Sequence, residues 1–311
     1  MSNATAESDF LLLEFSDVRQ LQFLHFTVFL MLYLATVTGN LLVISSVASD
    51  HHLHTPMYFL LMNLAMQDLG QISVTIPKSM INSLLNTRLI SYSGCVAQVF
   101  FFSFFGVSDF CLLTVMAYDR YVAICNPLHY EMVINRQACI EMIAGVWIAG
   151  FLYAGINTCG TFATHFCSNA VNQFFCEIPQ LIKLSCSGLN VVEMSSIGIA
   201  LILSLGCFIY ILVTYAQIFS TVFKVPSAKG RQKAFSTCVP HLFVCSIFIL
   251  TGSFAYLKPA YHTSSELDLI FGIIYSLVPP ILNPVIYSIR NKEIKQGMAK
   301  VLGFRVISLN T

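Results

Sequence analysis

Residues 95–118 of the chain read CVAQVFFFSFFGVSDFCLLTVMAY and run directly into the charged pair Asp119-Arg120. Asp109 is the one charged residue of the stretch, which is longer than the roughly 20 apolar residues that a helix needs to cross a bilayer core. Apolar and polar residues do not alternate along it, as they would in a strand of a membrane β-barrel. The stretch therefore predicts a transmembrane α-helix that ends at a charged pair.

Six other stretches have the same apolar character, at residues 23–48, 57–77, 142–164, 194–223, 234–257 and 269–289. Among these six, Asp68 in the second stretch is the one charged residue. Only 10% of the whole chain is charged, against roughly 25% in a soluble domain. So few charges cannot cover a globule with polar surface. The sequence therefore predicts an all-α membrane protein, a bundle of seven transmembrane helices.

We expect the seven-helix domain to occupy residues 23–290, between an extracellular tail at 1–22 and a cytoplasmic segment at 291–311. In the last segment, four apolar residues share one helical face: Ile294, Met298, Val301 and Leu302. Lysines lie on the polar side: Lys292, Lys295 and Lys300. This pattern predicts a short amphipathic helix that lies in the membrane interface against lipid, although a loose tail stays open as an alternative.

The distribution of positive charge predicts the orientation in the membrane, because cytoplasmic loops are enriched in Lys and Arg. One side of the predicted bundle has eleven: Arg120, Arg136, Lys224, Lys229, Arg231, Lys233, Arg290, Lys292, Lys295, Lys300 and Arg305. The other side has five: Arg19, Lys78, Arg88, Lys183 and Lys258. We therefore expect a multi-pass protein of the plasma membrane with its C-terminus in the cytoplasm and its N-terminus outside. The net charge of +1 gives no electrostatic case for a nucleic-acid partner.

The predicted outer side contains the features of an oxidising, glycosylating compartment. Asn3 begins a glycosylation sequon in the N-terminal tail. Four cysteines map to the same side, where disulfides persist: Cys95, Cys167, Cys176 and Cys186. Four cysteines allow three pairings, and Cys159 near the outer end of its helix is a possible competitor. The loop at 165–193 therefore predicts a lid held over the bundle by disulfides.

Five short strings stand in a fixed order along the chain. They are Gly39-Asn40, LHTPMY at 53–58, MAYDRYVAIC at 116–125, KAFSTC at 233–238 with His241 shortly after, and PILNPVIY at 280–287. Together they resemble the motifs of the olfactory (odorant) receptors, a branch of the rhodopsin-like (class A) G-protein-coupled receptors. The resemblance runs from about residue 10 to residue 303.

The resemblance implies a function. The chain would bind small volatile odorants, activate a heterotrimeric G protein with the stimulatory olfactory Gα, and raise cyclic AMP. It would be a receptor and not an enzyme, and would need no cofactor apart from a possible structural Na⁺. Of the three cysteine pairings, we expect Cys95–Cys176 and Cys167–Cys186.

The activation residues follow from the same motifs: Asp119, Arg120, Tyr121, Tyr215, His241, Asn283, Pro284 and Tyr287. Their chemistry agrees with this role, because an unpaired guanidinium at the end of an apolar helix is costly and a neighbouring carboxylate can neutralise it at rest. When the helices part, Arg120 is freed to contact a cytoplasmic partner. Pro284 removes one helical hydrogen bond, which gives a bend that can change on activation. Two interfacial anchors with no signalling role are the alternative for Asp119 and Arg120.

Asp68 and Asp109 are the carboxylates deep in the predicted bundle. The resemblance places Asp68 at the sodium-site acid of rhodopsin-like receptors and Asp109 where odorant receptors usually carry Glu. We expect the pair to hold a Na⁺ ion together with Asn40, Asn283 or a water molecule, because two carboxylates otherwise repel or share a proton. A protonated or water-bridged pair is the alternative.

The ligand pocket should lie in the outer half of the bundle. Position relative to the motifs selects ten candidates: Phe102, Ser103, Gly106, Val107, Ile199, Leu203, Gly252, Tyr256, Ile273 and Ser276. Each of them is equally compatible with ordinary helix packing. Phe102 stands where receptors for biogenic amines need an Asp, which disfavours a charged amine. We therefore expect small, mostly apolar, uncharged ligands.

Two departures from the family pattern concern ligand recognition. Ile249 follows Phe248 where odorant receptors usually have an aromatic residue, and the outer loop is one residue shorter than usual between Cys167 and Cys176.

The sequence disfavours two other functions. A retinal pump needs a lysine in the last span, and 269–289 has none, while a channel needs polar rings that are missing here. A receptor that acts outside the nose stays open.

Overall fold

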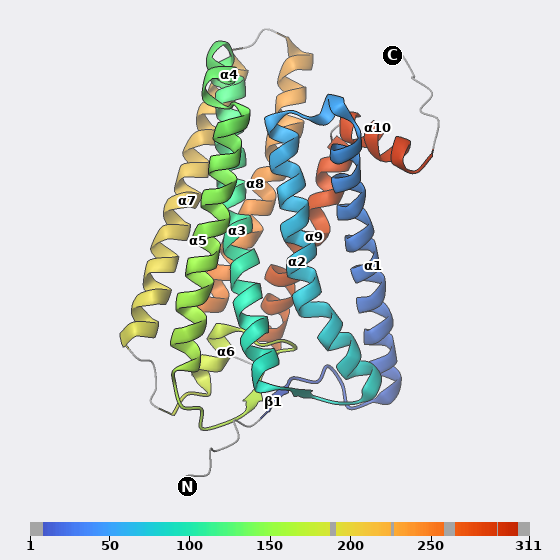
Figure 1. Ribbon diagram of the computed structural model, residues 1–311, viewed down its shortest axis with the longest axis vertical. Coiled ribbons are helices and arrows are strands. Elements are labelled where there is room, and N and C mark those ends of the chain that lie inside the picture. Colours follow the sequence, from blue (N-terminus) through green and yellow to red (C-terminus); the bar gives the residue numbers. More distant parts are fainter. Residues whose placement is uncertain (1–8, 187–190, 225–226, 258–264, 291, 304–311) are drawn as a thin grey trace.

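The computed structural model describes residues 9–186, 191–224, 227–257, 265–290 and 292–303. Asn3 therefore lies outside the described residues. In the described part, seven long helices pack side by side with their axes along the long dimension of the molecule (Figure 1). They are α1 (Arg19–Ser49), α2 (Pro56–Leu85), α3 (Tyr92–Cys125), α5 (Arg136–Phe162), α7 (Val191–Phe223), α8 (Ala228–Leu257) and α9 (Ser265–Arg290). Each covers one of the seven predicted spans, so the predicted fold class is confirmed.

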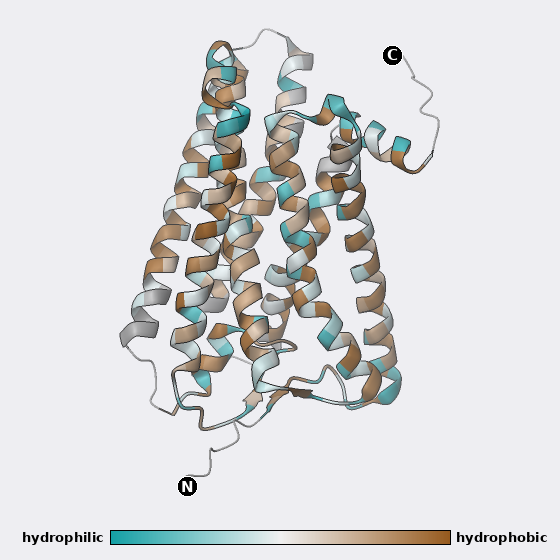
Figure 2. Cartoon of the chain, in the orientation of Figure 1, coloured by the Kyte–Doolittle hydropathy of each residue, from teal (hydrophilic) through white to brown (hydrophobic). Residues whose placement is uncertain are grey.

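The outer surfaces of these helices are apolar, as a lipid environment requires. Met31 on α1, Ile156 on α5 and Ile202 on α7 are each more than 60% exposed. Brown hydrophobic residues recur along the length of the helices in Figure 2. Five of the described helices are long and apolar enough to cross a membrane. In α8 the apolar stretch is shorter, Cys238–Phe254.

Several buried polar side chains lie on α2. Asn63, Gln67, Asp68, Gln71 and Thr75 are all buried on it. They point into the protein because lipid offers no hydrogen-bond partners. These buried side chains lower the mean hydropathy of α2. The same side chains line the polar centre of the bundle.

At one end of the bundle the N-terminal tail takes part in a small sheet. Strand β1 (Phe10–Leu12) lies between β2 (Leu89–Ile90), with which it is antiparallel, and β3 (Ala170–Val171), with which it is parallel. Phe10 and Leu12 are 2% and 1% exposed and pack against the end of α3 that we predict to be extracellular, called the outer end below. No pattern in the sequence predicted this sheet. The described part of the tail, from residue 9 onward, therefore belongs to the cap at this end, and α1 begins at Arg19 instead of residue 23.

At the opposite end, α10 (Lys292–Val301) runs across the direction of the bundle (Figure 1). Ile294 on it is fully buried, and the Tyr58 hydroxyl donates a hydrogen bond to Glu293 at 2.5 Å. Lys300 pairs with Asp50 at 2.6 Å, just before the short helix η1 (His51–Leu53). This pairing lowers the pKa of Asp50. The predicted amphipathic helix thus forms, and it is fastened to the loop between α1 and α2.

Candidate functional site

The two charged residues at the end of α3 form an ion pair with each other. Arg120 lies 3.8 Å from the Asp119 carboxylate, and the Asp119 side chain is only 2% exposed. A third residue completes the group, because the hydroxyl of Tyr130 donates a hydrogen bond to Asp119 at 2.7 Å. Tyr130 begins the short helix α4 (Tyr130–Val133), which follows η2 (Pro127–His129) in the loop after α3. Asp119 is therefore held from two directions.

The surroundings of Tyr130 keep its hydroxyl protonated, so that it can donate a hydrogen bond. Burial first, and the hydrogen bond to Asp119 second, raise the pKa of Tyr130. The spacing of the sequence motifs did not reveal this contact, because Tyr130 lies beyond the helix end and reaches back only when the loop folds. This arrangement holds the Arg120 guanidinium beside Asp119 of its own helix, as we expect for a resting state.

Two further predicted activation residues pack beside this pair. Tyr215 on α7 and His241 on α8 are 1% and 3% exposed, and their rings lie 5.5 Å apart. Tyr121 packs against the hydrophobic cluster that contains Tyr215. The side chain of Tyr287 lies outside the described residues. The structure thus brings α3, α7 and α8 together at the end of the bundle where Arg120 lies.

The residues of the predicted sodium site also lie in the centre of the bundle. Asp68 and Asp109 are 0% and 2% exposed, and Asn283 on α9 donates from its amide nitrogen to both Asp68 oxygens at 3.1 Å. Asn40 on α1 donates to the carbonyl of Pro280 at 3.3 Å. Helices α1, α2, α3 and α9 therefore meet around one buried carboxylate pair.

Oxygen atoms predominate around this centre. Both oxygens of Asp109 and the amide oxygens of Asn40, Gln71 and Asn283 are buried without a hydrogen-bond partner among the described residues. Acceptor oxygens without donors are suited to a hard cation, which prefers carboxylate and carbonyl ligands. The donor set of the site therefore fits the expected Na⁺.

The close approach of α1 and α9 explains the glycine in the first motif. A Cβ at Gly39 would lie 3.2 Å from Cβ and 3.3 Å from Cγ of Pro284. Pro284 is buried at this contact, beside Asn283. The glycine lets the proline-containing part of α9 approach the helix that supplies Asn40.

The outer end of the bundle is covered by a lid segment, residues 173–177, whose side chains are all 3% exposed or less. Its backbone is fixed from three sides. Ser79 of α2 donates to the Phe174 carbonyl at 2.9 Å, and Gln98 of α3 accepts from the Cys176 amide at 2.8 Å. The amide of Leu13 in the tail donates to the Gln173 carbonyl at 2.8 Å. The lid is thus tied to the helices and to the N-terminal segment together.

Both expected disulfides are present in the structure, Cys95–Cys176 and Cys167–Cys186. The first joins the lid to the outer end of α3. The second closes the base of the loop that contains β3 and the short helix α6 (Ile178–Lys183). Cys159, the possible competitor, is a free cysteine exposed on the surface.

Several of the predicted pocket residues lie beneath this lid. Phe102 is 6% exposed, and its ring lies 4.8 Å from that of Phe175 and 5.7 Å from that of Tyr275. Ser103 and Ser276 are also buried. Four more candidates are half-buried, Gly106, Val107, Gly252 and Ile273. The side chain of Tyr256 lies outside the described residues.

Two pocket predictions are wrong. Ile199 and Leu203 are 58% and 62% exposed on the outer face of α7. The buried stripe of this helix is set by Ile211, Tyr215 and Ile218, and steps of three or four residues continue it to Ser204 instead. An error of one position rotates a side chain by about 100° around the helix. Both side chains therefore face the lipid and not the predicted pocket.

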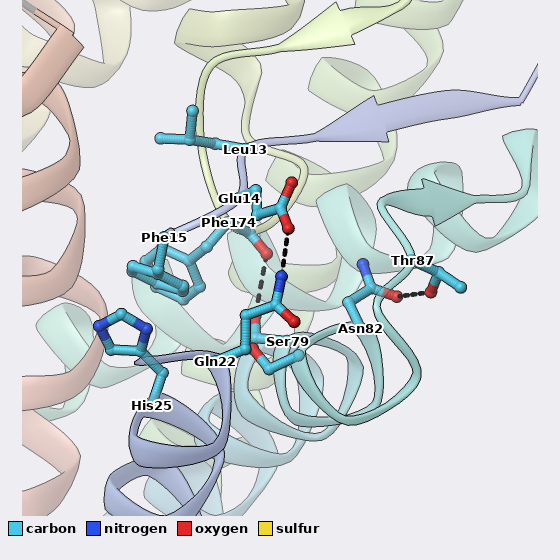
Figure 3. A pocket seen from close by; sticks show the side chains of 10 residues that line it. Leu13, Glu14, Phe15, Gln22, His25, Ser79, Asn82, Thr87 and Phe174 are labelled. Atoms are coloured by element: carbon cyan, nitrogen blue, oxygen red, sulfur yellow. Dashed lines mark hydrogen bonds between the residues drawn. The ribbon is translucent and has the colours of Figure 1, made fainter. Parts of the chain in front are cut away.

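A small cavity of about 20 Å³ lies between the tail, α1, α2 and the lid (Figure 3). Gln22 donates to Glu14 across it at 2.5 Å, and His25, Phe15 and Phe174 lie around it. The volume suits about one water molecule and is too small for an odorant. This cavity therefore belongs to the seam that attaches the tail.

Comparisons with known proteins agree with this architecture. Residues 29–304 match the family model described as "Olfactory receptor". The chain is 49% identical over 299 residues to olfactory receptor 14I1 of Homo sapiens, with 96% of each chain covered. It is 48% identical over 303 residues to olfactory receptor 14C36 of Homo sapiens, with 97% of each covered. Among solved structures it is similar in fold to squid rhodopsin, with a TM-score of 0.71 and 19% identity over 93% of this chain and 87% of that one.

Proposed function

The chain belongs to the olfactory receptor family and is a multi-pass membrane receptor that couples to a G protein, and we propose that it detects small, mostly apolar, uncharged odorants. The ligand would bind beneath the lid and favour the open arrangement of the bundle. A ligand shifts such an equilibrium only by its differential affinity for the two arrangements. We further propose that the partner is the stimulatory olfactory Gα and that the output is cyclic AMP.

The observation that carries this proposal is the ion pair of Asp119 and Arg120 at the bundle end opposite the lid. The lid and the pair lie at opposite ends of α3, so the helix connects the expected ligand site with the expected signalling site. Leu128 in η2 lies close to the pair in sequence and is 93% exposed, and Met132 and Val133 in α4 are 74% and 39% exposed. A group of exposed apolar side chains suits a docking partner at this end. In the proposed orientation, this end and α10 face the cytoplasm.

A reporter assay tests the proposal. Cells that express the chain are exposed to a broad odorant panel, and cyclic AMP is compared with surface expression. Arg120→Ala should abolish the response while the receptor still reaches the surface. Arg136→Ala, an exposed arginine at the start of α5, is the matched control and should respond normally. Normal cyclic AMP output from Arg120→Ala would contradict the proposal.

We also propose that Asp68 and Asp109 hold a Na⁺ ion in the resting state. The partnerless oxygens around the pair support this assignment. The melting temperature of the purified receptor should rise in sodium chloride relative to choline chloride, and Asp109→Asn should remove the difference. Equal melting temperatures in both salts would favour the alternative, a protonated or water-bridged pair. An agonist response that ignores sodium in both wild type and Asp68→Asn would also argue against the ion.

A further inference from the structure

A second cavity lies at the end of the bundle opposite the lid, between the end of α1, η1 and α10. Its volume is about 600 Å³, within the range of roughly 300–1,000 Å³ that is typical of ligand sites. Its lining residues belong neither to the predicted odorant pocket nor to the predicted activation residues. The cavity is therefore a candidate binding site that is separate from both.

Groups of both charges line this cavity. Asp50, which follows α1, supplies a carboxylate, and Lys300 of α10 supplies an ammonium group 2.6 Å away. His51 and His52 add two imidazoles, and an imidazole donates at least one N–H in either protonation state. A phosphate alone would be attracted by Lys300 and repelled by Asp50. The cavity therefore suits a ligand that contains an anionic and a cationic group.

The ion pair between Asp50 and Lys300 can accommodate such a ligand. The Lys300 side chain is 62% exposed, and an exposed ion pair contributes little to stability because water competes for both groups. One oxygen of Asp50 accepts from the His52 backbone amide at 3.1 Å, and the other accepts from Lys300. Each carboxylate oxygen accepts more than one hydrogen bond, and an ammonium group has three donors. Both side chains can therefore bind a ligand while the His52 amide holds the carboxylate in place.

Gly297 determines how closely α10 approaches α1 at this cavity. A Cβ at Gly297 would lie 3.1 Å from Cβ of Ser46 and 3.1 Å from Cδ1 of Leu53. Ser46 is fully buried and also lines the cavity. The close approach brings the following turn of α10, with Lys300, to the residue that follows α1. Packing of the two helices therefore forms the site.

Apolar surface adjoins the cavity on both helices. Val301, which lines it, is 42% exposed, and the neighbouring Leu302 is 53% exposed. On α1, Leu41 is 48% exposed, and Ala48 is exposed on the same helical face. Helix α1 lies at the edge of the bundle, and α10 lies beside its end (Figure 1). The charged cavity thus lies where lipid-facing surface ends, which is the depth at which lipid headgroups meet an interfacial helix.

We propose that this cavity binds the headgroup of a phospholipid with a primary ammonium group, such as phosphatidylethanolamine. The ammonium group donates to Asp50, the phosphate accepts from Lys300 and His52, and the acyl chains lie against the apolar surface beside the cavity. Phosphatidylcholine has the same phosphate but a quaternary ammonium without N–H donors, so it lacks the hydrogen bond to Asp50. One such hydrogen bond predicts a preference of about 3- to 10-fold for phosphatidylethanolamine. This lipid site goes beyond the proposed receptor function and does not depend on the odorant.

Lipid retention by the purified receptor tests the inference. Native mass spectrometry compares phosphatidylethanolamine with phosphatidylcholine of the same acyl chains, offered as an equal mixture. Asp50→Asn should abolish the preference of the wild type, while the Asn side chain can still accept from the His52 amide and keep the loop folded. Glu131→Gln, an exposed glutamate in α4 at the same end of the bundle, is the matched control and should keep the preference.

A second variant separates lipid recognition from the attachment of α10. Lys300→Gln breaks the same ion pair but leaves the Asp50 carboxylate. It should weaken retention of both lipids, because both have the phosphate, and should keep the preference for phosphatidylethanolamine. If Lys300→Gln removed the preference as Asp50→Asn does, the preference would follow the ion pair and not the carboxylate, and the inference would be overturned.

Soluble compounds distinguish a lipid site from a site for a free phosphate compound. Phosphoethanolamine should displace the bound lipid only at a far higher concentration, because it has no acyl chains to bury, and inorganic phosphate at that concentration should not displace it. Displacement by inorganic phosphate would overturn the inference. So would equal retention of the two lipids by the wild type, or an unchanged preference in Asp50→Asn.

Discussion

The hydrogen bond from Tyr130 to Asp119 predicts how firmly the receptor is held at rest. Tyr130→Phe keeps the ring and removes only the hydroxyl that donates at 2.7 Å to a carboxylate that is 2% exposed. A hydrogen bond to a charged group contributes about 1.5–3 kcal/mol. At about 1.4 kcal/mol for each factor of ten, its loss shifts the ratio of resting to active receptor by roughly 10- to 100-fold. A receptor that is about 1% active without ligand would then be about 10% active or more.

The assay is basal cyclic AMP per receptor at the cell surface, measured without odorant. Tyr130→Phe should raise it several-fold and lower the odorant concentration needed for a half-maximal response. Tyr33→Phe is the matched control, because its hydroxyl pairs with Ser73 at 3.2 Å on the exposed side of α1. Basal output that stays at the wild-type level in Tyr130→Phe would refute the reasoning. It would show that the hydrogen bond is equally strong in both states or absent from the resting one.

Three further predictions concern packing and the outer cap. Gly150→Ala should lower the melting temperature of the purified receptor, because the new Cβ would lie 2.1 Å from the Ser108 hydroxyl, whereas Gly155→Ala meets no atom within 4 Å and should be neutral or slightly stabilising. Leu11→Pro removes the amide that donates to the Asn169 carbonyl at 2.8 Å in the central strand of the outer sheet, so hydrogen exchange of the lid should accelerate while that of α5 stays unchanged. Cys95→Ser opens a disulfide of sequence separation 81 and should cost about 4 kcal/mol, measured as lost surface expression, and normal expression would argue against this account of the lid.

The comparisons also show how much sequence change the fold accommodates. The chain is 49% and 48% identical to two relatives over nearly its full length, but only 19% identical to squid rhodopsin. The same seven-helix arrangement therefore forms from widely different sequences.

The sequence by itself determined the helices and their order. Apolar stretches long enough to cross a bilayer leave no alternative in lipid, where each backbone group must be paired within the segment. That constraint is local, which is why all seven spans and the amphipathic helix at Lys292–Val301 were predicted. The helix ends were less exact, since α2 ends at Leu85 instead of residue 77 and α3 at Cys125 instead of residue 118. The motif strings likewise identified Arg120 and Asn283. Asp68 was identified because a carboxylate is rare inside a membrane.

Only the tertiary structure decided which face of each helix points inward and which segments meet across the bundle. Ile199 and Leu203 were misplaced because the lipid face and the protein face of α7 are both apolar, so no hydrophobic pattern fixes its rotation. Tyr130 lies beyond the end of α3 and reaches Asp119 only when the following segment folds back. The strand at Phe10–Leu12 pairs with segments about 80 and 160 residues away, Phe10 with Ile90 and Leu11 with Ala170. Contacts of that range depend on loop closure and packing of the whole chain, and no local pattern encodes them.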